Sequence, residues 1–405
     1  MPISQNAFDD EIQQFIELAA SLDLATIEEL RKIANRLADS PDLIFEDRIR
    51  QFVGDESKDW QDKASSWVSA SLASAYLRGI NVQEAEISSI VSSPRNQGNP
   101  IPAPFFADQS RMGGNISDEA ADILADYPEH WSVFSRYENT MQEAVNRARM
   151  PFYRSTVQHY RDLAALSMED TFRTGDRATR RELAQQVMDT FTDSGIKTIS
   201  FPTNHIMSVE AFSKRESRSY MQKVAVEGQI NRATEMGYDL VRINQYAGAS
   251  PMCAPHQGNV YSVSGNSSQY PPLRSAIHDG TYTYGSGIYH DYCGHYQSTY
   301  VPGVSESLGK LSDDPQEQAI INEMGEAEGN RFIYEARQQQ RKIEYRIRKY
   351  KRMQAGALDK RDRRRFGSLI RKWQKEQRTL LDEYDFLKRD YTKENLLWLR
   401  HSLIF

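Results

Sequence analysis

The sequence predicts a mainly α-helical protein with one small α+β module, built as an extended chain of several units with a helical N-terminal half. Three observations lead to this prediction. Apolar residues recur with a period of about 3.6 residues through most of the chain, as in amphipathic helices. The stretch 195–305 instead carries short alternating segments and is rich in Gly, Pro, Ser and Tyr. The mean hydropathy of -0.67 indicates that much of each helix is solvated.

At 405 residues the chain exceeds the size at which single cores stop growing, so we expect separate packed units. The predicted boundaries are a helical N-terminal unit over 1–91, a Pro/Gly/Asn/Ser-rich linker over 92–117, a helical unit over 118–194, the α+β module over 195–305 and a basic helical C-terminal arm over 306–405. The sequence has no run of about 18 apolar residues, and its start is acidic rather than signal-like. We therefore expect a chain made in a cytoplasm, with no membrane partner.

Three helices are expected in the N-terminal unit. Apolar residues from Phe8 to Ala19 share one face, and residues 26–29 (TIEE) have the form of a capping box that begins a second helix. A third apolar stripe runs from Trp60 to Ala75. It stops at Gly79, which we expect to be a left-handed C-cap.

Helical periodicity resumes near residue 118 and continues to about residue 194. Thr179 and Glu182 have the spacing of a second capping box. Pro151 predicts the start of a helix or a kink within one.

The α+β module is predicted to combine one helix with short strands. Residues 196–207 are β-branched and alternating enough for a strand that Pro202 interrupts. A helix is expected over 208–236. Strands are expected over 239–246 and near 259–263.

The C-terminal arm has the opposite charge to the rest of the chain. The net charge is -6, yet residues 331–390 hold 20 Lys or Arg against 9 Asp or Glu. Such a helix can contact DNA phosphates without reading base sequence, although a solvated charged helix or a coiled-coil surface explains the pattern equally well. The candidate nucleic-acid-binding residues are Arg361, Arg363, Arg364, Arg365, Arg371 and Lys372.

Both cysteines of the chain, and four of its eight histidines, lie between residues 253 and 295. A Cys-x-x-His pair at one end and a His-x-x-Cys-x-His group at the other can place sulfur and imidazole donors on two tight turns, as tetrahedral Zn²⁺ requires. With His278 set aside, five donors compete for four positions. The candidate ligands of a structural zinc ion are four of Cys253, His256, His290, Cys293 and His295.

Two other interpretations of this cluster stay open. The cysteines can be small buried side chains, with the histidines bonded within loops. Alternatively, Cys253 or Cys293 is a thiolate nucleophile activated by a neighbouring histidine. No nucleophile elbow, P-loop, GxGxxG or HExxH pattern occurs in the sequence, so we expect no catalytic residues.

Short motifs follow one another through the module. They are residues 195–196 (GI), 238–241 (YDLV), 257–265 (QGNVYSVSG), 270–271 (YP) and 290–303 (HDYCGHYQSTYVPG). Their order and spacing resemble the phage minor capsid protein family, specifically minor capsid protein 2. The resemblance is close over about 195–304 and extends to the basic region 335–389 and to Trp60–Gly79.

The resemblance implies a head-morphogenesis protein without catalytic activity, related to the Mu-type F head proteins and associated with the portal vertex. We therefore expect a virion protein, assembled in the host cytoplasm. The implied partners are the portal protein, the major capsid protein or other head proteins, and packaged double-stranded DNA. Two alternatives are a thiol- or metal-dependent enzyme delivered with the particle, and a nucleic-acid-binding protein with no capsid role.

The sequence departs from the family pattern at the cluster. Ser250 stands where relatives have the first cysteine of a CxxC pair, and Cys253 corresponds to the second. His256 replaces an aromatic residue, and Gly294 replaces an arginine. This departure predicts no zinc or sub-stoichiometric zinc, unless His256 compensates for the missing thiolate.

Overall fold

The structure is a computed structural model, and it describes residues 8–41, 46–92, 120–125, 127–193, 197–200, 206–277, 287–305 and 310–396. Within these ranges the protein is mainly α-helical with small antiparallel sheets, which confirms the predicted fold class. The predicted linker, apart from its first residue, lies outside the described residues.

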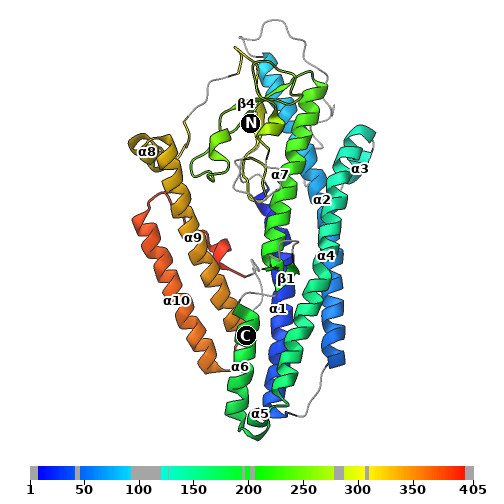
Figure 1. The fold of residues 1–405 in the computed structure, drawn as a ribbon, viewed down its shortest axis with the longest axis vertical. Coiled ribbons are helices and arrows are strands. Elements are labelled where there is room, and N and C mark those ends of the chain that lie inside the picture. The colour runs from blue at the N-terminus through cyan, green and yellow to red at the C-terminus, as the bar shows by residue number, and fades with distance from the viewer. Residues whose placement is uncertain are drawn as a thin grey trace. The chain divides into compact units, whose positions relative to one another are not determined.

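Helices account for most of the described chain (Figure 1). They are α1 (Asp9–Asp39), α2 (Glu46–Ser92), α3 (Ala120–Ala125), α4 (Pro128–Leu166), α5 (Asp170–Thr174), α6 (Arg177–Asp193), α7 (Val209–Glu235), α8 (Pro315–Met324), α9 (Glu326–Ala355) and α10 (Lys360–Glu383). The strands are β1 (Lys197–Ser200), β2 (Ile206–Ser208), β3 (Leu240–Ile243), β4 (Val260–Ser262) and β5 (Gln297–Thr299).

The strands form two small sheets. β1 pairs with β2, and β3 lies between β4 and β5, with Val241 opposite Tyr261 on one side and Thr299 on the other. Val241 and Ile243 are buried, as the alternation in the sequence predicts. The strands expected over 239–246 and near 259–263 are thus present as β3 and β4.

The chain divides into two compact units. Unit 1 comprises Met1–Ile12, Ser66–Gln142 and Arg215–Glu335, and unit 2 comprises Gln13–Ser65, Glu143–Lys214 and Ala336–Phe405. The boundary between them falls within α1, α2, α4, α7 and α9 rather than in loops.

Both predicted capping boxes are wrong. Thr26 lies inside α1, where its hydroxyl donates to the Leu22 carbonyl at 2.8 Å, so one helix replaces the two that were expected. α6 begins at Arg177, and its first turn is capped by Asp176, whose carboxylate accepts from the Thr179 amide at 2.8 Å. In α1 the buried apolar face continues through the apparent cap, because packing outweighs a local capping signal.

Gly79 does not end a helix either; it lies within α2, where α2 crosses α7. A Cβ atom at Gly79 would overlap the carbonyl oxygen of Ala225 in α7. A Cβ at Gly228 of α7 would likewise overlap the carbonyl oxygen of Tyr76 in α2. Glycine at both positions therefore permits the two backbones to approach closely. Pro151, which marked a helix start or a kink, lies in the interior of α4.

A buried polar chain joins three helices of unit 1. The Tyr76 hydroxyl of α2 lies 2.9 Å from His130 Nδ1 of α4, and His130 Nε2 lies 2.8 Å from a carboxylate oxygen of Glu235 in α7. Asn231 of α7 donates to the same hydroxyl at 2.8 Å. Polar networks of this kind, largely shielded from water, favour one arrangement of the helices.

The part of the predicted C-terminal arm that lies in unit 2 is a hairpin formed by most of α9 and by α10. α9 and α10 lie side by side (Figure 1), and the chain reverses at Gly356, where a Cβ would come within 2.8 Å of Thr192. Asp359 caps α10 by accepting from the Asp362 amide at 2.9 Å. The hairpin encloses a cluster of Met353, Ala357, Phe366, Tyr350 and Leu369.

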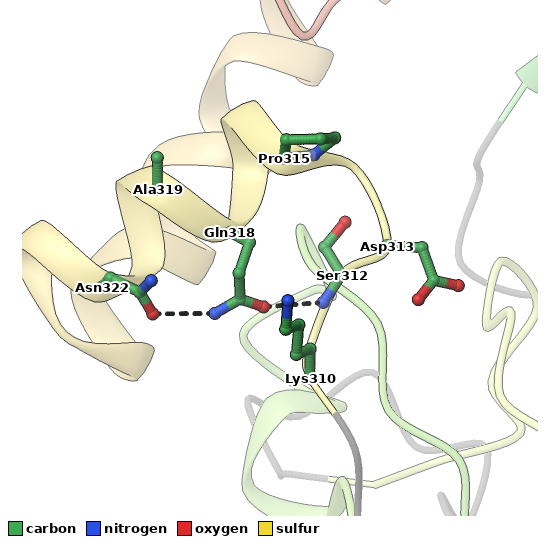
Figure 2. Close-up of a pocket in the computed structure, with 7 residues that line it drawn as sticks. All are labelled: Lys310, Ser312, Asp313, Pro315, Gln318, Ala319 and Asn322. Carbon is green, nitrogen blue, oxygen red and sulfur yellow. Dashed lines mark hydrogen bonds between the residues drawn. The ribbon is translucent and has the colours of Figure 1, made fainter.

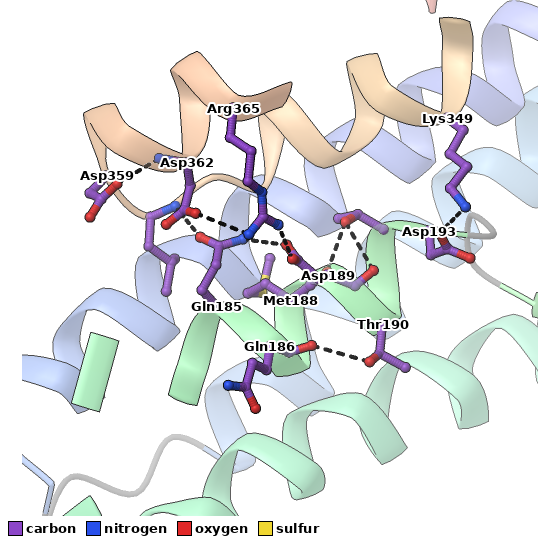
Figure 3. A network of polar contacts seen from close by, with 12 residues as sticks. Gln185, Gln186, Met188, Asp189, Thr190, Asp193, Lys349, Asp359, Asp362 and Arg365 are labelled. Carbon is purple, nitrogen blue, oxygen red and sulfur yellow. Dashed lines mark hydrogen bonds and ion pairs between the residues drawn. The ribbon is translucent and has the colours of Figure 1, made fainter. Parts of the chain in front are cut away.

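Polar contacts hold this hairpin on α6 (Figure 3). Gln185 accepts from the Leu358 amide at 2.7 Å, and Asp189 pairs with Arg365. Asp193 pairs with Lys349. Part of the basic arm is thus neutralised by acidic residues of the same unit.

A hollow in unit 1 lies at the start of α8, where Asp314 caps the helix (Figure 2). It is lined by Lys310, Ser312, Asp313, Pro315, Gln318, Ala319 and Asn322. Gln318 donates to Asn322 at 2.9 Å and accepts from the Ser312 amide at 3.3 Å. These bonds assign the hollow to the capping structure of α8.

We predict that Gly79→Ala lowers the free energy of unfolding by about 1–3 kcal/mol, because the added methyl group overlaps the backbone of α7. Chemical denaturation of the full chain measures the effect. Gly54→Ala is the matched control, since Gly54 lies in the same helix with nothing within 4 Å of its Cβ position. That control should gain up to about 1 kcal/mol from helix propensity. Equal stability of the two variants would contradict the close crossing.

Candidate functional site

Two turns of the module bring the cysteine and histidine cluster together. The first turn follows β3 and contains Ser250 and Cys253, with the Cys253 amide donating to the Ser250 carbonyl at 3.0 Å. The second turn precedes β5. Gly287, at its start, donates its amide to the Met252 carbonyl at 2.9 Å, so the two turns are bonded directly to each other.

Tyr289 sets the direction of the second turn. Its φ of +63° lies in the left-handed region, which a bulky side chain rarely adopts. The buried Tyr289 hydroxyl donates to Gln297 Oε1 at 3.1 Å, and this bond holds the strained backbone in place. His290 follows directly and is thereby turned toward Cys253.

Three side chains converge between the turns. Cys253 Sγ lies 3.1 Å from His290 Nε2 and 3.7 Å from Cys293 Sγ. The three ligand atoms all lie within 4.8 Å of one another. Both cysteines are free thiols, and they are only 1% and 2% exposed. These residues form the closest group of soft donors in the part of the chain that the structure describes.

Gln257 determines which nitrogen of His295 carries the proton. Gln257 Oε1 accepts from the Tyr246 amide at 2.8 Å, which identifies this atom as the amide oxygen. His295 Nε2 lies 3.0 Å from the same oxygen and must therefore donate to it. In the neutral ring, His295 Nδ1 is left without a proton and lies 3.5 Å from Cys293 Sγ.

Other contacts fix His295 in this position. Its ring stacks on Tyr246, with centroids 4.5 Å apart. Its carbonyl accepts from Gln222 of α7 at 2.6 Å, and its amide donates to Cys293 Sγ at 3.3 Å. The fully buried His295 thus connects the sulfur of Cys293 to the helical part of unit 1.

The two sulfurs compete for a proton. The hydrogen bond to Cys293, together with burial, raises the pKa of the Cys253 thiol. Burial opposes ionisation of Cys293 as well, but its hydrogen bonds to Cys253 and His295 and the electrostatic influence of His295 and His290 together lower the pKa of Cys293 well below its usual range. The geometry therefore favours one thiol and one thiolate, which is half of the ionisation that a metal requires.

His256 lies outside this group. Its Nδ1 is 2.8 Å from the Tyr261 hydroxyl, and burial lowers its pKa, which favours the neutral ring. Of the five predicted donors, the structure brings Cys253, His290 and Cys293 together and places His295 against Cys293. His278 lies outside the described residues.

Sequence reasoning from donor types missed two residues that matter here. Ser250 Oγ lies 3.4 Å from Cys253 Sγ and 3.4 Å from His290 Nε2. Asn330, at the start of α9, exchanges two 3.0 Å hydrogen bonds with the backbone of Ala249, one to its carbonyl and one from its amide. Only the family pattern, with cysteine at position 250, pointed to this turn. No local signal in the sequence marked Asn330.

The six predicted nucleic-acid-binding residues lie on α10 and are all exposed. Arg365 is held by Asp189 of α6 and by Asp362, so its charge is partly neutralised. Arg371 donates to the Ser368 hydroxyl at 2.9 Å, and this neutral partner does not offset the positive charge of the arginine. Lys372 lies 5.7 Å from the ring centroid of Trp373.

Comparison with known proteins places these features in a family. The family model described as phage minor capsid protein 2 matches residues 123–382. The chain belongs to that family. A "Structural protein" of Lactococcus phage LL-H is 22% identical over 365 residues, which cover 86% of this chain and 91% of that protein. No solved structure matches the chain.

The family match spans the module, the cluster and the basic hairpin, and it confirms the resemblance inferred from the motifs. Membership places the protein among the structural proteins of phage particles, with other head proteins as its partners. In the described part of the chain, every helix is too short or too polar to cross a membrane.

The contact between β5 and Glu86 of α2 should make the stability of the protein depend on pH. Glu86 of α2 accepts from the Thr299 amide at 3.4 Å, and burial raises the pKa of Glu86 to about 7. Because the folded pKa exceeds the unfolded value, this carboxyl group favours folding most below about pH 4.5 and loses that contribution as the pH rises to about 7.

We predict that Glu86→Gln increases the free energy of unfolding by about 1–2 kcal/mol at pH 8, because an amide keeps the bond to Thr299 without a buried charge. At pH 5 the difference between variant and wild type should be much smaller. Chemical denaturation at the two pH values measures both. The same difference at pH 5 and pH 8 would show that the carboxyl group does not titrate in this range.

Proposed function

We propose that this protein is a minor capsid protein at the portal vertex of a phage head, where it binds the portal protein and contacts packaged double-stranded DNA. The family match supports the role in the head. The basic face of α10 is the observation that carries the DNA contact.

This basic face occupies one side of α10. Its positions recur at spacings of three and four residues and therefore share a face. They are Arg361, Arg364, Arg365, Ser368, Arg371, Lys372, Lys375, Arg378 and Thr379. The set contains no carboxylate up to Thr379, and it extends over about 27 Å at 1.5 Å per residue.

The opposite side of α10 is buried, so the orientation of the basic face is fixed. Phe366, Ile370 and Leu380 are all less than a tenth exposed. Trp373 on the flank receives Arg346 of α9, whose guanidinium carbon lies 4.3 Å from the ring centroid. A rigid row of cations can neutralise phosphates of a duplex regardless of its base sequence, which suits packaged DNA.

Burial of the sulfurs supports a structural role over the alternative of a thiol enzyme. Cys253 and Cys293 are 1% and 2% exposed. A substrate could reach either sulfur only if the two turns separated. Nucleophilic cysteines usually lie in accessible, electropositive surroundings instead.

The DNA contact is tested with the triple variant Arg361→Gln, Arg364→Gln and Lys372→Gln in the full chain. We expect weaker binding to duplex DNA of any sequence. The slope of log K against log salt should fall by about 2–3, since each lost phosphate contact removes roughly 0.9. Fluorescence anisotropy at several salt concentrations measures both quantities.

The matched control removes the same charge from other helices, through Lys32→Gln, Lys58→Gln and Lys63→Gln. These lysines are also exposed, but they lie on α1 and α2. The control should keep the wild-type salt slope. If both triple variants lose the same affinity, binding reflects net charge and the basic face of α10 is not the site.

The portal contact is tested by lysine cross-linking of intact particles followed by mass spectrometry. We expect cross-links between this chain and the portal protein, at a copy number far below that of the major capsid protein. Particles in which the chain cross-links throughout the shell, or only to tail proteins, would contradict the proposed location.

A further inference from the structure

The first turn of the cluster contains an oxygen donor that completes a four-cornered arrangement. Ser250 Oγ is 3.4 Å from Cys253 Sγ and 3.4 Å from His290 Nε2. Cys253, His290 and Cys293 present two sulfurs and one nitrogen within 4.8 Å of one another, and the Ser250 oxygen lies against two of these three atoms. Such a donor set suits a borderline-soft divalent cation, above all zinc.

The distances agree with tetrahedral coordination. With Zn–S bonds of about 2.3 Å and Zn–N or Zn–O bonds of about 2.0–2.1 Å, the edges of the tetrahedron are about 3.8 Å between two sulfurs, about 3.6 Å from sulfur to nitrogen or oxygen, and about 3.3 Å from nitrogen to oxygen. Four of the six edges are measured: 3.7 Å between the sulfurs, 3.4 Å from Ser250 Oγ to each of Cys253 Sγ and His290 Nε2, and 3.1 Å from Cys253 to His290. Of these four edges, only the one from Cys253 to His290 has to widen, by about half an ångström.

Ser250 fits the fourth corner better than either remaining histidine. Neither ring nitrogen of His256 belongs to the group of ligand atoms that lie within 4.8 Å of one another, and its Nδ1 lies 2.8 Å from the Tyr261 hydroxyl. His295 Nδ1 approaches Cys293 Sγ but does not belong to the group of ligand atoms that lie within 4.8 Å of one another. The His295 amide bond to that sulfur, at 3.3 Å, is the contact of a residue that supports a ligand.

We propose that Cys253, His290, Cys293 and the hydroxyl of Ser250 bind one zinc ion, and that Ser250 makes this a weak site which the single substitution Ser250→Cys converts into a tight one. A neutral hydroxyl donates less charge to zinc than a thiolate does. The proposed zinc site therefore has one weak ligand, the Ser250 hydroxyl. This proposal does not depend on the proposed portal or DNA contacts.

His290 weakens the site further. As the side chains lie, the Tyr292 amide donates to His290 Nδ1 at 3.3 Å, so the ring proton is on Nε2 and faces Cys253. Coordination through Nε2 moves this proton to Nδ1 and breaks the contact with Tyr292. The Cys253 thiol must also lose its proton. Zinc uptake thus releases the proton of the Cys253 thiol, whereas the His290 proton stays on the ring.

The test is a zinc titration of the purified full chain under a non-thiol reductant, in competition with a chromophoric chelator. We expect one zinc per chain in the wild type, binding roughly 10–100-fold tighter in Ser250→Cys and weaker in Ser250→Ala. Cobalt substitution gives a second readout, because sulfur-to-cobalt charge-transfer bands should strengthen when the third thiolate is added. Thermal unfolding with and without zinc gives a third, with the larger stabilisation in Ser250→Cys.

His256→Gln is the control and should bind zinc as the wild type does, since His256 is not at a corner. Loss of zinc in that variant would assign the fourth corner to His256 and overturn the role of Ser250. Unchanged affinity in Ser250→Ala would also overturn that role. The whole proposal fails if neither the wild type nor Ser250→Cys binds zinc, provided that cooperative unfolding at the same temperature shows that both proteins are folded.

Discussion

Unit 1 depends on the close crossing of α2 and α7. Because Gly79 and Gly228 lack side chains, the two backbones meet where any other residue would separate them. At this separation the buried amides of α7 reach the loop that precedes β5 and the strand itself: Gln222 donates to the His295 carbonyl and Gln229 to the Gln297 carbonyl. The donors of the cluster are therefore positioned by two helices that supply no ligand of their own. The arrangement of these two helices follows from the backbone contacts at Gly79 and Gly228, which lie far from the cluster in the sequence.

Much of this fold can be predicted from sequence, because an apolar stripe with helical period identifies a helix whatever its partners. The ends of the helices are less predictable. Thr26 has the sequence signature of a cap, yet its hydroxyl bonds within α1 because buried apolar residues continue on both sides of it. Gly79 has the signature of a helix end, and only the presence of α7 shows why glycine is needed there. The reversal at Gly356 likewise depends on α6. Each of these outcomes is decided by a neighbour that is distant in sequence.

The candidate site is likewise only partly predictable from the sequence. The concentration of cysteine and histidine is visible in the sequence, since donor types can be counted. Which donors converge is not visible: His256 and His295 have equal claims by spacing, but Tyr261 occupies the first and Gln257 orients the second. The basic arm was recognisable from its charge, whereas the pairing of Arg365 with Asp189 required the fold of unit 2. By residue type alone the hydroxyl of Ser250 is not a candidate ligand; the family pattern pointed to its position, and the atoms around it show what it contacts.

The paired hydrogen bonds between Asn330 and Ala249 have a consequence for how this module can change over time. These bonds hold both the amide and the carbonyl group of Ala249, as a neighbouring strand would. The backbone of the next residue, Ser250, is therefore held in one position. The side chain in that position can be exchanged without rebuilding the loop. Most serine codons are a single nucleotide away from a cysteine codon, so one mutational step can exchange the two residues at this position.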